Sequence, residues 1–309
     1  MNRRIACLSV TALLLCVVGT THAEPFRLRV MTLNILAGGE RLGQPLSQTV
    51  KVIEAAQADI VGMQECFQGE RDSSAVIAKE LGWQHFYQGG RTSVLSRWPI
   101  VGHTPRKWGV SVRLPSGQVV SVFNVHFAPA PYQPYQFARI PYGDYPFIKT
   151  EGQALYFARK ARGHQVDSLF KELKPTLADG VTCFLTGDFN EPSFQDWTDR
   201  AADAGRVPLS VVYPATKRVS GAGMVDGYRK VFPNELTHRG WTWTPMTKPT
   251  DPMDRHDRID YVFSSQHGVT AHSAAVVGES KEFADIVVTP WPTDHRGVVV
   301  EYELADTNE

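Results

Sequence analysis

The sequence predicts a single α/β domain in which two β-sheets pack against each other. Three observations favour this class. Segments with the apolar pattern of buried strands alternate with amphipathic helical segments from residue 26 onward, and the last third of the chain is rich in strands. No stretch has the composition of a linker between domains, and no short repeat is present. With 309 residues, 42% hydrophobic and 21% charged, the chain has the length and composition to bury one large core.

The first 23 residues predict an export signal. A basic start, MNRR, precedes an apolar stretch, residues 5–19, that is too short to span a bilayer comfortably, and THA before Glu24 fits a small-residue cleavage site. We therefore expect residues 1–23 to be a signal peptide, residues 24–309 to form the domain, and the mature protein to be secreted or periplasmic. Lipoprotein anchoring is the weaker alternative, because LLLC at Cys16 lacks the expected small residues.

Strands and helices are expected to alternate in the N-terminal half. The expected strands cover residues 26–36, 59–65, 90–103 and 107–127, and the expected helices cover residues 47–57 and 73–82. Ser47 is the expected N-cap of the first helix, and Gly82 closes the second. The PSG sequence at residues 115–117 predicts a hairpin turn.

The C-terminal half begins with a proline- and aromatic-rich segment, residues 128–147. A long helix over residues 150–173 follows, and Thr150 with Gln153 gives it a capping box. The later segments predict a strand at 180–190, a helix at 193–205, and strands at 240–245, 258–265, 269–278 and 296–304.

Polar side chains occupy expected strand ends, where a core strand has no packing reason to hold them. They are Asn34, Glu65, His126, Asp188, Asn190, Asp294 and His295, with Asp260 inside an otherwise apolar strand. Each has a structural alternative. Glu65 could cap a turn, and His126 could be a core imidazole. Asp260 could pair with Arg258 or another arginine. Together they favour a shared site, because buried carboxylates and imidazoles without partners are costly and one domain seldom holds so many.

This combination of groups fits the hydrolysis of a phosphate ester. Carboxylates bind a hard, oxygen-seeking cation such as Mg²⁺. Histidines move protons, and amides can orient phosphate oxygens or the attacking water.

Six short motifs occur in order between Arg27 and Leu304: LN, QE, NVHF, GDFN, RIDY and TDHRG. This ordered set resembles the endonuclease/exonuclease/phosphatase superfamily, which includes pancreatic-type deoxyribonuclease, abasic-site endonucleases, neutral sphingomyelinases and inositol polyphosphate phosphatases. With its export signal, the chain resembles a secreted bacterial-type member. The resemblance implies a four-layer sandwich, with two mixed β-sheets packed face to face, helices on both outer faces, and the site at the strand ends.

The resemblance also implies the metal site. Glu65 would be the principal metal-binding carboxylate, Asn34 would support it, and Asp294 would lie near the metal or orient its neighbours. Mg²⁺ is the expected ion, with Mn²⁺ or Ca²⁺ as alternatives.

The resemblance implies roles for the catalytic residues as well. Asp188 and Asn190 would flank the scissile phosphate, and His126 would face it and protonate or hydrogen-bond the leaving oxygen. His295 would pair with Asp260, which would fix its tautomer and raise its basicity. Either His295 or Asp188 could take the proton from the attacking water, and our hypothesis is His295.

Two departures separate the chain from the abasic-site endonucleases. Those enzymes carry an additional acidic metal ligand at the position of Leu36, and they lack a histidine at the position of His126. Both differences favour the secreted nuclease, sphingomyelinase and phosphatase branches.

The substrate is less closely defined. The aromatic segment after His126 is expected to border the cleft and bind substrate or lipid, or else to pack on its own aromatics; Tyr142 and Arg139 are the candidate substrate-binding residues. Trp241 and Trp243 are expected to be core strand residues. Lys149 and Arg255 are further candidate phosphate contacts.

The charge balance lowers the expectation of tight nucleic-acid binding. Removal of residues 1–23 takes away Arg3 and Arg4 and no acidic residue, which leaves 30 basic against 32 acidic residues, and no Lys/Arg cluster stands out. The first hypothesis is therefore a secreted metal-dependent hydrolase that acts on small phosphomonoesters or phosphodiesters by in-line attack of water. The alternatives are a secreted DNA or RNA endonuclease, a sphingomyelinase-like phospholipase, and a non-catalytic binding protein. No stable protein partner is implied. Cys66 and Cys183, which remain after export, are expected to be buried free thiols, and a disulfide between them is the alternative.

Overall fold

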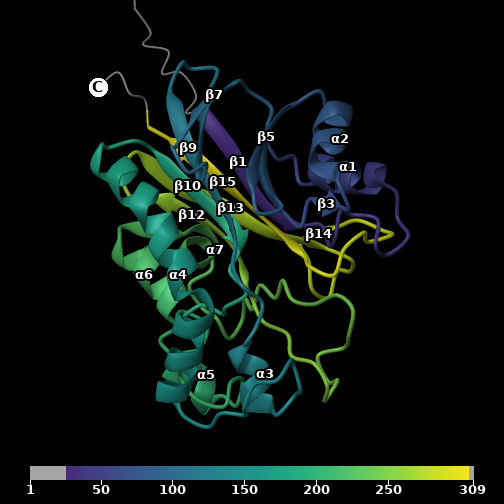
Figure 1. Cartoon of the computed structure of the whole chain (residues 1–309), viewed down its shortest axis with the longest axis vertical. Helices are drawn as coiled ribbons and strands as arrows, with labels where there is room; N and C mark the ends of the chain where they lie inside the picture. Colours follow the sequence, from purple (N-terminus) through teal and green to yellow (C-terminus); the bar gives the residue numbers. More distant parts are fainter. Residues whose placement is uncertain (1–25, 306–309) are drawn as a thin grey trace, which may run out of the picture.

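Residues 26–305 are described by the computed structural model, and they form two β-sheets with helices on the outer faces (Figure 1). The predicted signal peptide, residues 1–23, lies outside the described residues. Among the described residues, no helix has the length and apolar character needed to cross a membrane.

The first sheet has seven strands and is mixed, because β1 pairs parallel with β2 and antiparallel with β15. Its order is β14 (Ile286–Val287), β13 (Val269–Gly278), β15 (Gly297–Leu304), β1 (Phe26–Asn34), β2 (Ile60–Gln64), β6 (Thr92–Ser96) and β5 (Gln84–Gly89).

The second sheet has six strands and is also mixed, because β10 pairs parallel with β9 and antiparallel with β12. Its order is β11 (Met224–Asp226), β12 (Asp260–Ser265), β10 (Cys183–Asp188), β9 (Val119–His126), β8 (Gly109–Arg113) and β7 (Ile100–His103). A small separate ribbon joins β3 (Phe67–Gln68) and β4 (Arg71–Asp72).

Three apolar layers hold the sheets and helices together. The central one lies between the sheets, where Val30 and Val300 of the first sheet share a cluster with Val122 and Phe184 of the second. The helices α1 (Leu46–Ala55) and α2 (Ser73–Leu81) cover the outer face of the first sheet, and α4 (Glu151–Ala178) and α6 (Pro214–Gly221) cover that of the second (Figure 1). The predicted four-layer α/β sandwich is therefore confirmed.

Beyond the strand ends, a further region extends the molecule (Figure 1). It contains α3 (Gln133–Ala138), α5 (Asp199–Asp203) and long loops that follow α7 (Gly227–Val231). Its own apolar cluster, with Trp197 and Tyr213, packs against the N-terminal part of α4.

Several local predictions are confirmed. Thr150 and Gln153 form the expected capping box at the start of α4, and Gly82 ends α2 in the left-handed conformation. The PSG turn joins β8 to β9. Cys66 and Cys183 are both free and buried.

Other local predictions are wrong. The N-cap of α1 is Pro45 and not Ser47, which lies inside the helix. Residues 240–245 form no strand, only an isolated bridge at Trp243, and the helix expected at 193–205 is reduced to α5. Residues 90–103 contain two strands, β6 and β7, which belong to different sheets. The chain passes from one sheet to the other between these strands. The local sequence pattern does not predict this, because it depends on contacts with residues far away in the chain.

Candidate active site

Strand register places three of the predicted side chains in one row. His126, Asp188 and Asp260 are directly paired across the neighbouring strands β9, β10 and β12. The carboxyl ends of β9 and β10 meet because these strands are parallel, whereas β12 begins there because it runs the opposite way. The row therefore lies along one end of the second sheet.

The first sheet contributes Asn34 and Glu65 from the ends of β1 and β2. Nδ2 of Asn34 donates to Oε1 of Glu65 at 3.3 Å and, across the gap between the sheets, to Oδ2 of Asp188 at 3.1 Å. Oε2 of Glu65 accepts a hydrogen bond from the backbone N–H of Ala37 at 2.8 Å. Asn34 therefore connects the polar ends of both sheets.

A polar contact behind the site fixes the spacing of the sheets. Gln64 donates to Oδ1 of Asn124 at 2.6 Å, and Thr186 donates to the same oxygen at 3.2 Å. Gly62 lies opposite, where an added Cβ would be 1.9 Å from the hydroxyl of Thr186. Only glycine allows the sheets to approach this closely at that point.

His295 and Asp260 form a buried pair. Nδ1 of His295 lies 2.9 Å from Oδ2 of Asp260, and both side chains are almost fully buried. Nε2 of His295 faces Asp188, 3.7 Å from its Oδ2. The ring of Trp243 packs against the imidazole with 4.9 Å between centroids. The carboxylate thus fixes the orientation of the ring and leaves Nε2 directed at the shared space.

The two carboxylates also control the charge of His295. Burial alone would lower its pKa, but Asp260 and Asp188 outweigh this effect and raise the pKa of His295 to about 10. Without a cation, the imidazole is therefore protonated at neutral pH. A bound cation near Asp188 would oppose that charge and lower the pKa.

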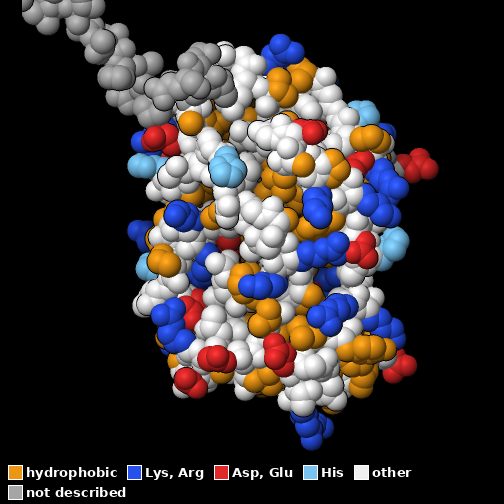
Figure 2. Space-filling model, turned by 90° about the vertical axis from the view of Figure 1, so that its left-hand side faces the viewer, with side chains coloured by type: hydrophobic (Ala, Val, Ile, Leu, Met, Phe, Trp, Pro, Cys, Tyr) orange, Lys and Arg blue, Asp and Glu red, His pale blue; other side chains and the backbone are white. Residues whose placement is uncertain are grey.

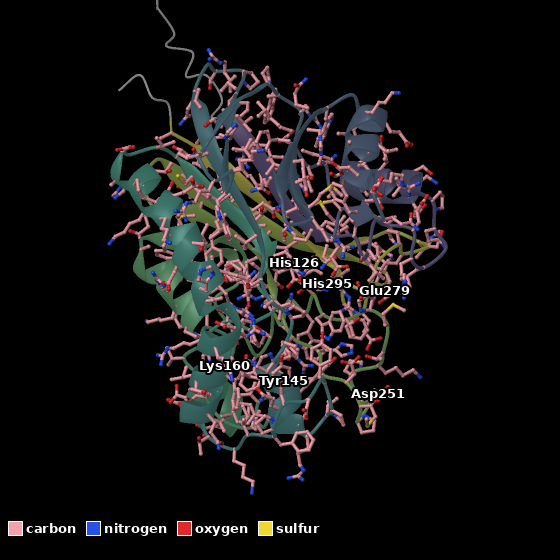
Figure 3. The ribbon with its side chains drawn as sticks, viewed as in Figure 1. His126, Tyr145, Lys160, Asp251, Glu279 and His295 are labelled. Carbon is pink, nitrogen blue, oxygen red and sulfur yellow. The ribbon has the colours of Figure 1, made fainter. Side chains whose placement is uncertain are left out.

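His126 approaches the same carboxylate from the other side. Its Nε2 lies 3.5 Å from Oδ2 of Asp188 and 3.9 Å from Oε1 of Glu65. Asn190 adds a backbone N–H to Oδ1 of Asp188 at 2.8 Å, while its Nδ2 donates to the carbonyl of Phe127 at 3.0 Å. Figure 3 shows His126 and His295 close together at the ends of the strands.

The donor set fits a hard divalent cation. Asp188, Asp260 and His295 each offer a ligand atom within 4.8 Å of the others, a buried group that is a metal-site candidate. Nδ1 of His295 and Oδ2 of Asp260 are already hydrogen-bonded to each other, however. The oxygens of Asp188 and Glu65 are therefore the better-placed metal ligands.

Repulsion between the carboxylates of the cluster also supports a site for a divalent cation. Burial raises the pKa of Glu65, but the Ala37 N–H and His126 outweigh it, so the net shift is downward and the group is ionised. The pKa of Asp294 is raised by burial and by the neighbouring charges of Glu65 and Asp188, with His295 opposing. Several carboxylates thus share a confined space, which a divalent cation would neutralise.

The predicted substrate-binding residues differ in position. The pKa of Tyr142 is raised by burial and by the carboxylates of Asp188 and Glu65, which places the phenol within electrostatic reach of the cluster. Arg139 is exposed, and its guanidinium lies 5.1 Å above the ring of Phe147. Among the described contacts, no hydrogen bond or ion pair joins Arg139 to the cluster.

Sequence reasoning missed a buried pair that supports the site. Arg162 of α4 is 1% exposed, donates to the carbonyl of Pro131 at 3.0 Å and to Gln133 at 2.9 Å, and lies 3.7 Å from Glu191. Glu191 directly follows Asn190, so the pair connects the loop after β10 with the loop after β9. The sequence did contain a signal for the burial of Arg162, because this residue lies at helical spacing between Ala158 and Val166 on the buried face of α4.

The partner of Arg258 and the position of Trp243 differ from what the sequence suggested. Arg258 pairs with Asp226 at 2.7 Å and with Asp196 at 2.9 Å, so it is not the partner of Asp260. Trp243 is not a core strand residue but a half-buried side chain in contact with His295.

Folding also gathers basic residues that are scattered in the sequence. Arg159, Lys171 and Lys174 of α4 lie with Arg218 of α6 around neighbouring cavities. Figure 2 shows the face that carries these helices, with Lys and Arg side chains across its middle. Asp167 neutralises Arg218, but the face remains predominantly basic.

Comparison with known proteins places these observations in a family. The sequence model of the Endonuclease/Exonuclease/phosphatase family matches residues 31–295. An uncharacterized Caenorhabditis elegans protein is 23% identical over 307 residues, which cover 93% of this chain and 95% of that protein.

Solved structures share the fold at low sequence identity. An endonuclease/exonuclease/phosphatase protein from Beutenbergia cavernae matches with a TM-score of 0.57 at 19% identity, over 91% of this chain and 72% of that chain. An AP endonuclease from Archaeoglobus fulgidus matches with a TM-score of 0.55 at 17% identity, over 88% and 98%. A 3'-5' exonuclease from Neisseria meningitidis matches with a TM-score of 0.57 at 16% identity, over 90% and 100%.

Proposed function

The chain belongs to the endonuclease/exonuclease/phosphatase family and is a metal-dependent phosphoesterase or nuclease, and from this premise we propose that it hydrolyses small phosphate esters after export. The reaction is the in-line attack of water on a phosphomonoester or phosphodiester. Export is supported by the composition of residues 1–23.

The observation that carries the proposal is the placement of Asp188 between two imidazoles. Oδ2 of Asp188 lies 3.5 Å from Nε2 of His126 and 3.7 Å from Nε2 of His295. Hydrolysis requires one group to accept the proton of water and another to donate to the leaving oxygen. Two imidazoles near one carboxylate oxygen can supply those two roles.

The residues divide the work as follows. His295, held by Asp260, takes the proton of the attacking water, and His126 donates to the leaving oxygen. Asn34 and Asn190 orient oxygens next to Asp188. A divalent ion held by Glu65 and Asp188 would polarise the phosphate and offset its charge.

A small ester is favoured by the position of Tyr142. Its phenol responds to the charges of Asp188 and Glu65 and contacts the ring of Tyr135 edge to face at 5.6 Å. The ring is 43% exposed, so it offers one hydroxyl and one ring face to a compact substrate.

A nuclease is the second candidate, and a basic cavity next to His126 favours it. This cavity, of about 350 Å³, is lined by Arg106, Lys107, His126 and His164. It leads from the catalytic cluster toward the basic face of α4, a path that would suit a chain of phosphates. Two of the structures named above are nucleases by name.

Two further alternatives remain from the sequence. The exposed rings of Tyr145 and Phe147 would suit a lipid surface, as a sphingomyelinase-like phospholipase requires. A non-catalytic binding protein would have no use for both His126 and His295.

Direct assay of the mature protein separates these functions. Residues 24–309 would be offered nitrophenyl phosphate mono- and diesters, plasmid DNA and sphingomyelin vesicles, each with Mg²⁺, Mn²⁺ or Ca²⁺ and each with a chelator. We expect metal-dependent hydrolysis of a nitrophenyl ester, lost in His295→Ala and retained in His272→Ala, an exposed histidine of β13. Plasmid nicking at lower enzyme concentration than ester hydrolysis would favour the nuclease. Absence of all hydrolysis with metal present would contradict an enzymatic role.

A further inference from the structure

The indole of Trp243, which packs against His295, is held by a second residue. The backbone N–H of Trp243 donates to the carbonyl of Asp257 at 3.0 Å, and its carbonyl accepts from the N–H of Asp257 at 2.9 Å, so the main chain is fixed. The ring lies 4.9 Å from the imidazole of His295, with 58° between the ring planes. Nε1 of the indole donates to the hydroxyl of Tyr135 at 3.0 Å. This hydroxyl therefore helps to set where the indole lies relative to the imidazole.

Tyr135 can restrain the indole because its own hydroxyl has a fixed partner. The residue lies in α3 and is 8% exposed, and its hydroxyl donates to Oδ1 of Asp254. That carboxylate also accepts hydrogen bonds from the hydroxyl of Thr247 at 2.8 Å and from the backbone N–H of Arg255 at 2.7 Å. Burial and the hydrogen bond to Asp254 raise the pKa of Tyr135, so the hydroxyl keeps its proton. It donates to the carboxylate and accepts from the indole at the same time.

Packing around Tyr135 limits its movement. Tyr135 forms a buried apolar cluster with Tyr132, Ile140 and Ile259, and Trp243 packs against this cluster. The ring of Tyr132 meets that of Tyr135 edge to face at 5.0 Å. Side chains packed in this way have little freedom to change rotamer. The segment after β9 thus reaches the candidate active site through one intermediate side chain, that of Trp243.

The contact with Trp243 restrains His295 in a direction that Asp260 does not. The hydrogen bond to Asp260 fixes the position of Nδ1, but the imidazole can still rock about this bond. Rocking would move Nε2 away from Asp188, whose Oδ2 is 3.7 Å distant. A side chain packed against the ring opposes that movement. Such restraint matters for the rate, because a misplacement of about 1 Å in a reacting group can cost about a hundredfold.

We propose that Tyr135 is a positioning residue for the hydrolysis: its hydroxyl, anchored by Asp254, holds Trp243 against His295 and so keeps Nε2 directed at the space beside Asp188. The inference rests on the proposed function, in which His295 accepts the proton of water. Tyr135 acts through Trp243 on the proton-transfer step, so its loss lowers kcat and leaves KM nearly unchanged.

Steady-state kinetics of Tyr135→Phe test the proposal. Phenylalanine keeps the ring that packs against Tyr132 and Tyr142 and removes only the hydroxyl. We expect kcat on the best ester to fall about tenfold and KM to stay within about twofold. Tyr132→Phe is the matched control, because it removes a neighbouring buried hydroxyl that donates to Asp257 at 3.0 Å, and it should leave kcat unchanged. Thermal unfolding would verify that both variants are folded.

A double variant tests whether Tyr135 acts through the indole. Trp243→Phe keeps a ring beside His295 but has no N–H for Tyr135. The double variant Tyr135→Phe, Trp243→Phe should therefore be no slower than the slower single variant. Losses that multiply in the double variant would overturn the proposal. So would an unchanged kcat in Tyr135→Phe, or an equal loss in Tyr132→Phe, which would indicate a general loosening of the cluster.

NMR of the metal-free protein separates this inference from the proposed function. The carbon-bound imidazole protons of His295, assigned with His295→Ala, report the ring current of Trp243 at one fixed pH. We expect their resonances to shift in Tyr135→Phe and to stay in place in Tyr132→Phe. Unchanged resonances in Tyr135→Phe would overturn the positioning role, whether or not the protein hydrolyses an ester. Shifted resonances in a protein that hydrolyses no ester would contradict only the proposed function.

Discussion

Nδ1 of His295 lies 2.9 Å from Oδ2 of Asp260 inside the protein, although the two residues come from different segments. Asp260 starts β12 of the second sheet, and His295 lies just before β15 of the first, which begins at Gly297. The pair therefore joins the two sheets at the site. Oδ1 of Asp260 has no hydrogen-bond partner, so the hydrogen bond of this carboxylate is the one between Oδ2 and His295.

Asp260→Asn should reduce turnover by about a hundredfold or more, because an amide no longer selects the tautomer or stabilises the imidazolium. Steady-state kinetics on the best ester would measure the loss, and Asp251→Asn, in an outer loop, is the matched control. A loss of only severalfold would mean that His295 is not the group that moves the proton.

The rate should fall at acid pH. His295 must be neutral to accept a proton, and Asp260 and Asp188 raise its pKa to about 10 in the metal-free protein. Metal binding should lower that pKa, and Asp260→Asn should shift the rising part of the pH–rate curve to lower pH. The check is a pH–rate profile for both proteins from about pH 5 to about pH 9. A flat wild-type profile across this range would contradict the role of His295.

Glu65→Gln should weaken the response to metal at least about tenfold, because it removes the ionised oxygen that faces His126 and Asn34. Activity measured against the concentration of Mg²⁺ gives the apparent affinity, and a chelator should abolish activity in the wild type. Glu54→Gln, on the exposed side of α1, is the control. Unchanged metal dependence in Glu65→Gln would contradict Glu65 as a ligand and would favour Asp188, Asp260 and His295 as the metal ligands.

Stability should decrease with rising pH through Glu191. Burial raises the pKa of this carboxyl to about 7, although Arg162 and the N–H of Ala215 oppose the shift. The folded state therefore holds the proton more tightly than the unfolded chain from about pH 4.5 to about pH 7, and ionisation costs up to about 1.4 kcal/mol of unfolding free energy per pH unit.

Urea unfolding of the wild type and of Glu191→Gln tests this prediction. The cost of the substitution should be largest near about pH 5 and smaller above about pH 7, since only the wild type loses stability across that range. A cost that is constant with pH would contradict the raised pKa of Glu191.

Most candidate site residues could be predicted from the sequence, because the pattern that marks them is local. A polar side chain that ends an apolar strand is visible in the order of residues alone, as with Glu65 after β2 and Asp188 in GDFN. The capping box of α4 and the β8–β9 hairpin were predictable because each depends on contacts between near neighbours. The cap at Ser47 failed because Pro45 already sets the backbone for the first turn.

By itself, then, the sequence determined which strands end in metal- and proton-binding groups and that two sheets pack together. Only the tertiary structure decided that His126, Asp188 and Asp260 lie side by side and that Arg162 pairs with Glu191 in the loop after β10. The physical reason is that strand register and the packing of loops depend on contacts between residues far apart in the chain. No local pattern of side chains encodes those contacts.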